Sequence, residues 1–228
     1  MKILMVLTSQ SEPGNTGKKT DFWMEEFAAL DYILKDSRAT ITIASPKEGQ
    51  PPIDPTSSVK ANQTEATYRF DKDAALKELL AHTKIISEVS TNDFDAVLYS
   101  GGHSPLWDLT NDKDSIELIE KFWSDKKPVA AVCHKPSVLL HLMDEENLPL
   151  LKDNKITGFT NTEEEAVGLT NIVPFLLEDE LKFKGVSILK KKDWASHVVN
   201  DGLLITGQNP ASSKEAAKTL LELLKKIK

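Results

Sequence analysis

Short apolar runs alternate with amphipathic stretches along the chain, a pattern that predicts strands separated by helices. Residues 2–8 form a largely apolar run of strand length, and residues 21–37 repeat apolar side chains at helical spacing. A second strand is expected at 39–44. The apolar start of the chain also resembles the core of a signal peptide, but the segment after it has no small-residue cleavage pattern. We therefore expect a first core strand there.

The centre and the end of the chain repeat this alternation. A strand at 96–99, a helix at about 113–124 and a strand at 129–132 follow one another, and a strand at 202–207 precedes a terminal helix over 210–228. The strands are short runs of Val, Ala, Ile and Leu without polar alternation, which is typical of strands buried on both faces of a parallel sheet. The pattern predicts an α/β protein with a flavodoxin-like, doubly wound, mostly parallel sheet and helices on both faces.

We expect residues 1–228 to form a single domain. A chain of 228 residues with 40% hydrophobic side chains can bury a large core. No internal repeat, low-complexity tract or linker divides it. Residues 46–70 are rich in Pro, Ser, Thr, Gln and Asn and are too long for a simple connector. We expect this segment to be a covering excursion that helps to wall a site.

Charge and cysteine content narrow the choice of partners. Asp and Glu outnumber Lys and Arg by 35 to 28, and the resulting net charge of −7 repels phosphate backbones and anionic lipids. No apolar run approaches the roughly 20 residues of a membrane-spanning helix. We therefore expect neither nucleic acid nor a membrane as a partner. A single cysteine cannot form an intramolecular disulfide, which favours a reducing compartment, the cytoplasm.

In a sheet of this kind, ligands bind beyond the carboxyl ends of the strands, so the residues that follow each strand are the first candidates for a site. After the first strand, the segment from Gly14 to Thr20 resembles a phosphate-binding loop. That loop requires glycine at the position of Glu12 and serine or threonine at the position of Lys19. We therefore reject a phosphate-loop function for this segment.

Cys133 directly follows the strand at 129–132, and Pro136 favours a helix start just after it. A sharp strand-to-helix turn would expose the thiol above the sheet, and the N–H groups of a helix N-terminus would favour the thiolate. We expect Cys133 to be a nucleophile and His134 to be its base or proton carrier, with neither side chain buried. The alternative is an inert cysteine at the end of a strand.

Two other segments offer groups to such a site. Gly101 and Gly102 follow the strand at 96–99 and permit a turn whose N–H groups face an oxyanion, although an ordinary turn is the alternative. On the helix over 21–37, a rotation of roughly 100° per residue puts Glu26 on the apolar face and Glu25 toward solvent. An inward carboxyl group is a candidate acid or base, whereas a carboxylate that reaches water at the edge of the helix is the alternative.

The histidines differ in what their positions suggest. His103 lies in the turn that follows the two glycines, where it can line a pocket, whereas His82 and His141 are expected to be structural. Cys133 and His134 are adjacent and project differently, and no spaced set of His or carboxylate residues predicts a tetrahedral metal site. We therefore expect no metal and no other cofactor.

Four blocks of the sequence together resemble the ThiJ/PfpI superfamily, which has the class I glutamine amidotransferase-like fold. The blocks are residues 101–109, 130–136, 159–164 and 201–213. The segment 20–26 and the spacing of the blocks are most similar to the heat-shock chaperone and glyoxalase III branch of this superfamily. The resemblance covers essentially the whole chain.

The resemblance implies a role for each matching position. Cys133 corresponds to the nucleophile of the family, Glu26 to the carboxyl group that contacts it, and His134 to the proton-transfer residue. Glu164 matches the carboxylate that orients this histidine. Gly102 and His134 match the positions whose backbone N–H groups form the oxyanion hole.

Gly101, His103 and Lys135 are further candidates for the wall of a substrate pocket. Lys135 departs from the family pattern, which usually has glycine at this position. A nearby ammonium group would favour the Cys133 thiolate, and its bulk would obstruct large substrates. The alternative is that Lys135 points to solvent and affects neither property.

The resemblance implies an enzyme that converts methylglyoxal, a small 2-oxoaldehyde, to lactate without glutathione or a metal. A role in protein and carbonyl repair would use the same site. Two alternatives stay open: a stress-induced holdase chaperone that binds unfolded proteins and uses Cys133 as a redox sensor, and a cysteine peptidase or amide hydrolase. Because the family commonly forms homodimers, we also expect a homodimer.

Overall fold

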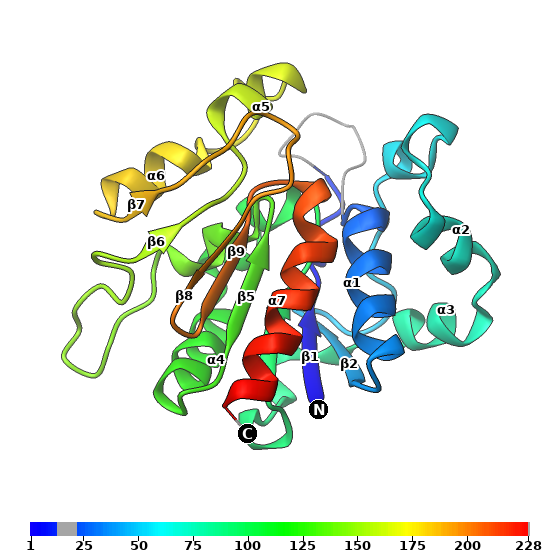
Figure 1. The fold of residues 1–228 in the computed structure, drawn as a ribbon, viewed down its shortest axis with the longest axis horizontal. Coiled ribbons are helices and arrows are strands. Elements are labelled where there is room, and N and C mark those ends of the chain that lie inside the picture. Colours follow the sequence, from blue (N-terminus) through cyan, green and yellow to red (C-terminus); the bar gives the residue numbers. More distant parts are fainter. Residues whose placement is uncertain (13–21, 228) are drawn as a thin grey trace.

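The computed structural model describes residues 1–12 and 22–227 and contains a seven-stranded sheet at its centre (Figure 1). The strand order is β3-β2-β1-β4-β5-β9-β8, and all neighbours are parallel except β8 and β9. This is the doubly wound, mostly parallel sheet that the sequence predicts. The strands are β1 (Lys2–Val6), β2 (Thr40–Ser45), β3 (Lys84–Ile85), β4 (Ala96–Tyr99), β5 (Val129–Val132), β8 (Val198–Asp201) and β9 (Leu204–Gly207).

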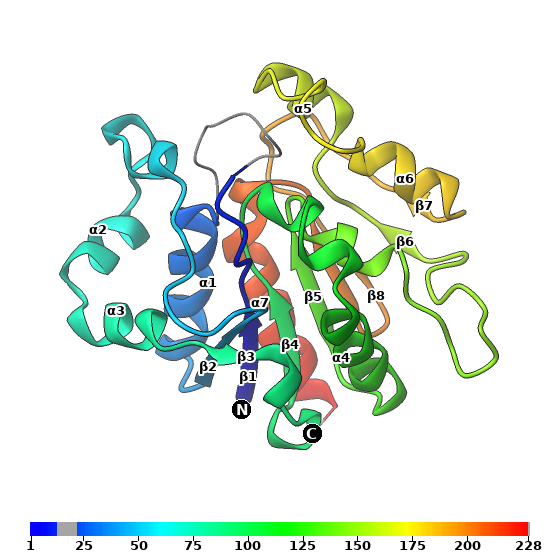
Figure 2. The same cartoon turned by 180° about the vertical axis from the view of Figure 1, so that it is seen from behind.

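Helices cover both faces of this sheet (Figures 1 and 2). Helices α1 and α7 pack against each other on one face, and α4 lies on the other face. None of the helices in the described ranges is long and apolar enough to cross a membrane. The helices are α1 (Met24–Asp36), α2 (Glu65–Lys72), α3 (Ala74–Ala81), α4 (Lys113–Ser124), α5 (Asn161–Ala166), α6 (Leu177–Phe183) and α7 (Ser213–Lys226).

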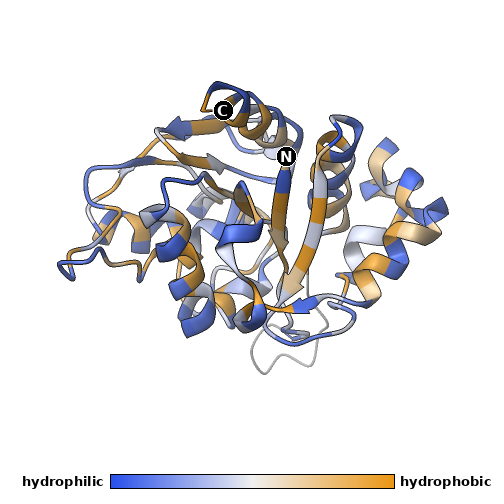
Figure 3. Cartoon of the chain, turned by 90° about the horizontal axis from the view of Figure 1, so that it is seen from below, coloured by the Kyte–Doolittle hydropathy of each residue, from blue (hydrophilic) through white to orange (hydrophobic). Residues whose placement is uncertain are grey.

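The three adjacent strands β1, β4 and β5 form the centre of the core. Every residue of β4 and β5, and every residue of β1 after Lys2, is buried. Figure 3 shows the apolar residues along these central strands and polar residues on the outward sides of the helices. Burial on both faces explains why the strands have no polar alternation in the sequence.

Helix α1 brings a carboxyl group to the carboxyl end of the sheet. Phe27, Leu30 and Leu34 are fully buried against the core, as their spacing predicts. Glu26, in the first turn of the helix, is fully buried on the same side. The inward position of Glu26 that the helical rotation predicts is therefore confirmed.

The structure contains elements that the apolar pattern did not predict. The strand expected at 202–207 is the second half of a β8–β9 hairpin, whose turn contains Gly202 with a φ of 62°. A separate two-stranded parallel sheet joins β6 (Lys155–Ile156) to β7 (Ser187–Ile188). These strands are short or carry polar residues such as Asn200, so they give no apolar run.

Residues 46–70 pack against the beginning of α1. The Asp54 N–H donates to the Phe22 carbonyl at 3.1 Å, and the Thr64 hydroxyl donates to the Glu25 carboxylate. This contact corrects the expectation for Glu25, which is half-buried rather than turned to solvent. The covering role of 46–70 stays a prediction.

The rejected phosphate-loop segment, Gly14 to Thr20, lies outside the described residues.

Candidate active site

The ends of two neighbouring strands carry the candidate site. Gly101 and Gly102 follow β4, and Cys133 follows β5, which pairs with β4 in the sheet. Cys133 has a φ of 65°, a left-handed conformation that is unusual for a side chain other than glycine and typical of a nucleophile elbow. Its N–H donates to the Gly207 carbonyl and its carbonyl accepts from the Phe159 N–H, both at 2.9 Å. These two bonds hold the backbone of the elbow in place.

A chain of contacts joins Cys133, His134 and Glu164. The Cys133 Sγ lies 3.3 Å from Nδ1 of His134, and Nε2 of His134 lies 2.7 Å from Oε2 of Glu164. The other oxygen, Oε1, lies 3.1 Å from Nε2 of His103. A carboxylate only accepts hydrogen bonds, so both histidines donate Nε2–H. The lone pair of His134 Nδ1 therefore faces the thiol.

Burial and neighbouring groups leave His134 neutral and Glu164 ionised at neutral pH. Burial, with the neighbouring His103 and Lys135, lowers the pKa of His134 to about 4, although Glu164 acts in the opposite direction. Burial by itself would raise the pKa of Glu164, but His134 and His103 outweigh burial and hold that pKa well below its usual range. At neutral pH the site therefore contains a neutral imidazole, able to accept a proton, beside an ionised carboxylate.

Glu26 has a different environment. Burial raises the pKa of Glu26 to about 7, although the Cys133 thiol, the Lys135 ammonium and the Gly102 amide act in the opposite direction. At neutral pH both forms of this carboxyl group are populated. Glu26 is therefore able to exchange a proton next to the sulfur atom.

The environment of Cys133 corrects the expectation of an exposed thiolate. Burial and the neighbouring Glu26 carboxyl group raise the pKa of the thiol well above its usual range. The helix after the elbow is only a short 3-10 helix, η7 (Lys135–Leu139), and all of its residues are buried. Cys133 and His134 are 3% and 0% exposed, so neither is the accessible side chain that the sequence predicted. The resting thiol is protonated and depends on a base for activation.

Aromatic rings close over His134. Its ring centroid lies 3.9 Å from that of His103 and 4.2 Å from that of Phe159. Trp194 in turn contacts Phe159 edge-on, with centroids 5.7 Å apart. This stack accounts for the complete burial of the imidazole and therefore for its low basicity.

The glycine turn packs directly against the start of α1. Gly101 and Gly102 have φ values of 65° and 85°. A Cβ atom at Gly101 would lie 3.1 Å from the Trp23 nitrogen and 3.2 Å from Cβ of Glu26, so another side chain would be strained and would push against the start of α1. A hydrogen bond from the Gly102 amide lowers the pKa of Glu26, and a hydrogen bond from the His134 amide lowers the pKa of the Cys133 thiol. Both N–H groups therefore flank the reactive pair, and their use as an oxyanion hole stays a prediction.

Lys135 is fully buried, so the alternative in which it points to solvent is wrong. As the first residue of η7, it follows the elbow into the interior of the protein. Its ammonium group lowers the pKa of both Glu26 and His134. Lys135 is thus an electrostatic part of the site.

Glu163 is a buried residue of the site region that the sequence analysis missed. Thr160 and Glu163 have the spacing of a helix capping box, a signal in the sequence that could have identified it. The carboxylate ties the start of α5, and with it Glu164, to two other segments, the one at Trp194 and the one at Gln208 and Asn209. Five groups donate to it: the Thr160 N–H, the Thr160 hydroxyl, the Trp194 N–H, the Gln208 amide and the Asn209 amide, at 2.8–3.1 Å.

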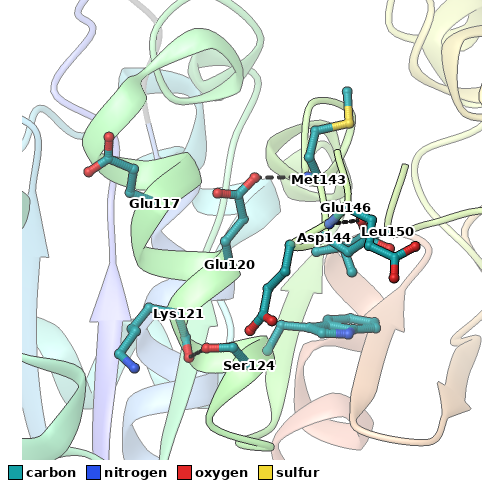
Figure 4. Close-up of a pocket in the computed structure, with 10 residues that line it drawn as sticks. Glu117, Glu120, Lys121, Ser124, Met143, Asp144, Glu146 and Leu150 are labelled. Carbon is teal, nitrogen blue, oxygen red and sulfur yellow. Dashed lines mark hydrogen bonds between the residues drawn. The ribbon is translucent and has the colours of Figure 1, made fainter. Parts of the chain in front are cut away.

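A surface hollow of about 730 Å³ lies between α4 and residues 143–150 (Figure 4). Its wall contains carboxylates such as Glu117, which is exposed, and Glu120, which accepts from the Met143 N–H at 2.8 Å. None of the predicted site residues and no histidine or cysteine lines it. The hollow therefore lacks the thiol and imidazole that the candidate site at Cys133 combines.

The fold also brings together a set of potential metal ligands. His103, His134 and Glu164 each place one ligand atom within 4.8 Å of the others. The sequence analysis found no such set, because the three residues come from separate segments and have no ligand spacing.

Comparison with known proteins gives consistent results. Glyoxalase 3 of Candida albicans is 28% identical over 230 residues, which cover 97% of each chain. The glutathione-independent glyoxalase HSP31 of Saccharomyces cerevisiae is 32% identical over 169 residues, 72% of this chain and 71% of that protein. The crystal structure of glyoxalase III from Candida albicans superimposes with a TM-score of 0.90 at 29% identity and covers 98% of this chain and 97% of that one.

A second solved structure is also similar over its whole length. The Rapid Encystment Protein 24 KDa of Francisella tularensis has a TM-score of 0.93 at 32% identity, with 98% of both chains covered. The sequence profile of the DJ-1/PfpI family, the family that the four sequence blocks indicated, matches residues 24–223. The chain therefore belongs to the DJ-1/PfpI family.

Proposed function

We propose that this protein is a glutathione-independent glyoxalase that converts methylglyoxal to lactate. The observation that carries the proposal is the contact chain from the Cys133 thiol through neutral His134 to ionised Glu164. Its similarity to Glyoxalase 3 and HSP31, two proteins named as glyoxalases, supports the same chemistry. A small 2-oxoaldehyde also suits a nucleophile that is only 3% exposed.

The reaction begins with attack of Cys133 Sγ on the aldehyde carbon. The thiol proton passes to Nδ1 of His134, which lies 3.3 Å from the sulfur. The new C–S bond leaves negative charge on the aldehyde oxygen, where the N–H groups of Gly102 and His134 stabilise it. Return of the proton from His134 to this oxygen gives a hemithioacetal.

His134 then moves a proton between the two carbons. Nδ1 removes the hydrogen of the former aldehyde carbon, and the electron pair passes to the ketone oxygen to form an enediolate. His134 returns this proton to the second carbon, and the hydroxyl proton of the first carbon passes to the oxygen of the second, which gives a lactoyl thioester on Cys133. Glu164 keeps Nε2 protonated throughout, so Nδ1 remains the site of proton exchange.

Hydrolysis of the thioester completes the cycle. Water adds to the thioester carbonyl, the C–S bond breaks, and the Cys133 thiol is regenerated with release of lactate. Overall one methylglyoxal and one water give one lactate, so no redox cofactor is required. Glu26, beside the sulfur and with a pKa of about 7, is suited to protonate the leaving sulfur. Gly101 and His103 form the adjacent pocket wall.

The test is production of lactate from methylglyoxal by purified protein in the absence of glutathione. Cys133→Ser should lower the rate at least about 1000-fold, because a hydroxyl is far less acidic than a thiol. The thermal unfolding midpoint of the variant serves as the control for an intact fold. A wild-type protein that forms no lactate, or a variant that retains its rate, would contradict the proposal.

We also infer a homodimer that works in the cytoplasm. The single cysteine favours a reducing compartment, and closed two-fold pairs are the commonest soluble oligomers. Light scattering should give twice the monomer mass. A monomer mass at all concentrations would contradict the dimer, and an exported pool of the protein would contradict the compartment.

A further inference from the structure

Two histidines of the site share a single carboxylate. Nε2 of His103 and Nε2 of His134 lie 3.1 and 2.7 Å from the two different oxygens of Glu164. The histidine rings face each other with centroids 3.9 Å apart and planes inclined by 37°. Both Nε2 atoms therefore point in a similar direction, toward the same carboxylate.

The spacing of these atoms is close to that of a zinc site. Zinc binds imidazole nitrogen and carboxylate oxygen at about 2.0–2.2 Å, so neighbouring ligand atoms of a tetrahedral ion are about 3.3 Å apart. One ligand atom of each residue lies within 4.8 Å of those of the other two, a range that includes this spacing. The N···O distances of 2.7 and 3.1 Å run to different oxygens of Glu164, so an ion would replace these two hydrogen bonds and move the ligand atoms apart by roughly half an ångström.

The chemistry of the three ligands also favours zinc. Two imidazoles and a carboxylate form a donor set that zinc prefers over magnesium or calcium, which bind mostly to oxygen. The ionised Glu164 supplies negative charge, whereas the Lys135 ammonium near His134 opposes a cation. The His103 side chain is 16% exposed, so it is the most solvent-accessible of the three ligands and the side from which an ion would enter.

We propose that His103, His134 and Glu164 form an inhibitory zinc site. Each neutral imidazole binds the ion through Nε2 and keeps its one proton, which moves to Nδ1 by exchange with solvent. His134 then carries a proton on the nitrogen that faces the Cys133 sulfur, and it cannot accept the thiol proton. The binding site stands by itself, and only the inhibition rests on the proposed function.

The binding test uses Co²⁺ as a spectroscopic probe on the full chain in metal-free buffer. Wild type should bind one Co²⁺ per chain with visible ligand-field bands and no sulfur-to-cobalt charge-transfer band, and Zn²⁺ should displace it. His103→Gln and Glu164→Gln should each weaken Co²⁺ binding at least about 10-fold. Cys133→Ser and the matched control His141→Gln, at an exposed histidine, should bind as wild type does.

Several outcomes would overturn the site. These are unchanged Co²⁺ binding in His103→Gln, loss of binding in Cys133→Ser, a sulfur-to-cobalt band in wild type, or no binding at all. Circular dichroism of each variant checks that a loss of binding is not a loss of folding.

Activity is measured separately. Zn²⁺ should suppress lactate formation by wild type, a chelator should restore it, and the Zn²⁺ concentration needed should rise at least about 10-fold in His103→Gln relative to its own uninhibited rate. Zinc binding without loss of rate would overturn the inhibition. If methylglyoxal is not a substrate at all, the cobalt spectrum still decides whether the metal site exists.

Discussion

Glu26 and Glu164 lie at the two ends of the contact chain that runs through Cys133 and His134, and both are almost completely buried. Glu164 accepts N–H bonds from two histidines, and its pKa is held well below the usual range. Glu26 faces a thiol, an amide and an ammonium group, yet burial raises its pKa to about 7. Two carboxyl groups that are both almost completely buried therefore have pKa shifts of opposite sign.

The difference shows that the hydrogen-bond donors around a buried carboxylate, rather than its depth, decide its ionisation. With two strong donors, Glu164 stays ionised, and in the proposed mechanism it orients His134. Glu26 is close to half-protonated near neutral pH, and in the proposed mechanism it exchanges a proton with the sulfur or the substrate. The following predictions test this contrast.

The largest effect is expected from Glu26→Gln. Loss of the exchangeable proton should lower the rate of lactate formation about 1000-fold, as is typical for a general acid or base. Glu25→Gln is the matched control on the same turn of α1, since Glu25 is half-buried and accepts from Thr64. Equal losses of rate in the two variants would contradict the assignment.

Stability should depend on pH with opposite signs for the two carboxylates. Glu26, with a pKa raised from 4.5 to about 7, contributes stability below pH 4.5 that is lost as the pH rises through 7. Glu26→Gln should therefore gain up to about 3 kcal/mol in unfolding free energy relative to wild type between pH 4 and pH 8.

Glu164, with a lowered pKa, contributes stability above pH 4.5 that is lost on acidification. The destabilisation caused by Glu164→Gln should therefore be constant from pH 5 to 8 and shrink below pH 4.5. Urea unfolding from pH 3 to 8 measures both differences. If the unfolding free energies of the two variants change with pH in the same way, the two carboxylates do not differ as predicted.

Glu164→Gln should lower the rate of lactate formation on the order of 100-fold. A neutral amide no longer specifies Nε2–H on His134, so part of the population has the wrong tautomer, as when an amide replaces the orienting carboxylate of a catalytic triad. The neighbouring Glu165 is exposed, and Glu165→Gln is the matched control. Full activity of Glu164→Gln would show that His134 needs no orientation.

The smallest effect is expected from Lys135→Met. Because the Lys135 ammonium lowers the pKa of Glu26, its removal should move the Glu26 limb of the pH–rate profile upward by about one pH unit. Lys152→Met, at an exposed lysine, is the control. Identical pH–rate profiles for wild type and Lys135→Met would show that the buried ammonium has no influence on the reaction.

The sequence predicted where the site residues lie relative to the strands and to the buried face of α1. The apolar runs of β4 and β5 mark the strand ends, and the helical rotation of α1 places Glu26 inward, because local periodicity records which face is buried. The β8 strand was missed since polar residues such as Asn200 interrupt it.

The side-chain environments were much less predictable. The contact between His103 and Glu164 joins residues 61 positions apart, and no local pattern encodes it. Lysine is usually exposed, so nothing at Lys135 signals its complete burial. The buried thiol follows from the fold of η7 and the aromatic rings over His134, which depend on tertiary packing.

The bonds to Glu163 have a consequence for the slow motions of the chain. The main-chain amides of Thr160 and Trp194 both donate to this buried carboxylate, although the Trp194 side chain is 47% exposed. An amide exchanges its hydrogen with solvent only when its hydrogen bond opens. Here opening would leave the buried Glu163 carboxylate with one donor fewer, which costs free energy. The Trp194 amide should therefore exchange deuterium on the timescale of the core strands, in a segment that looks like an ordinary surface loop.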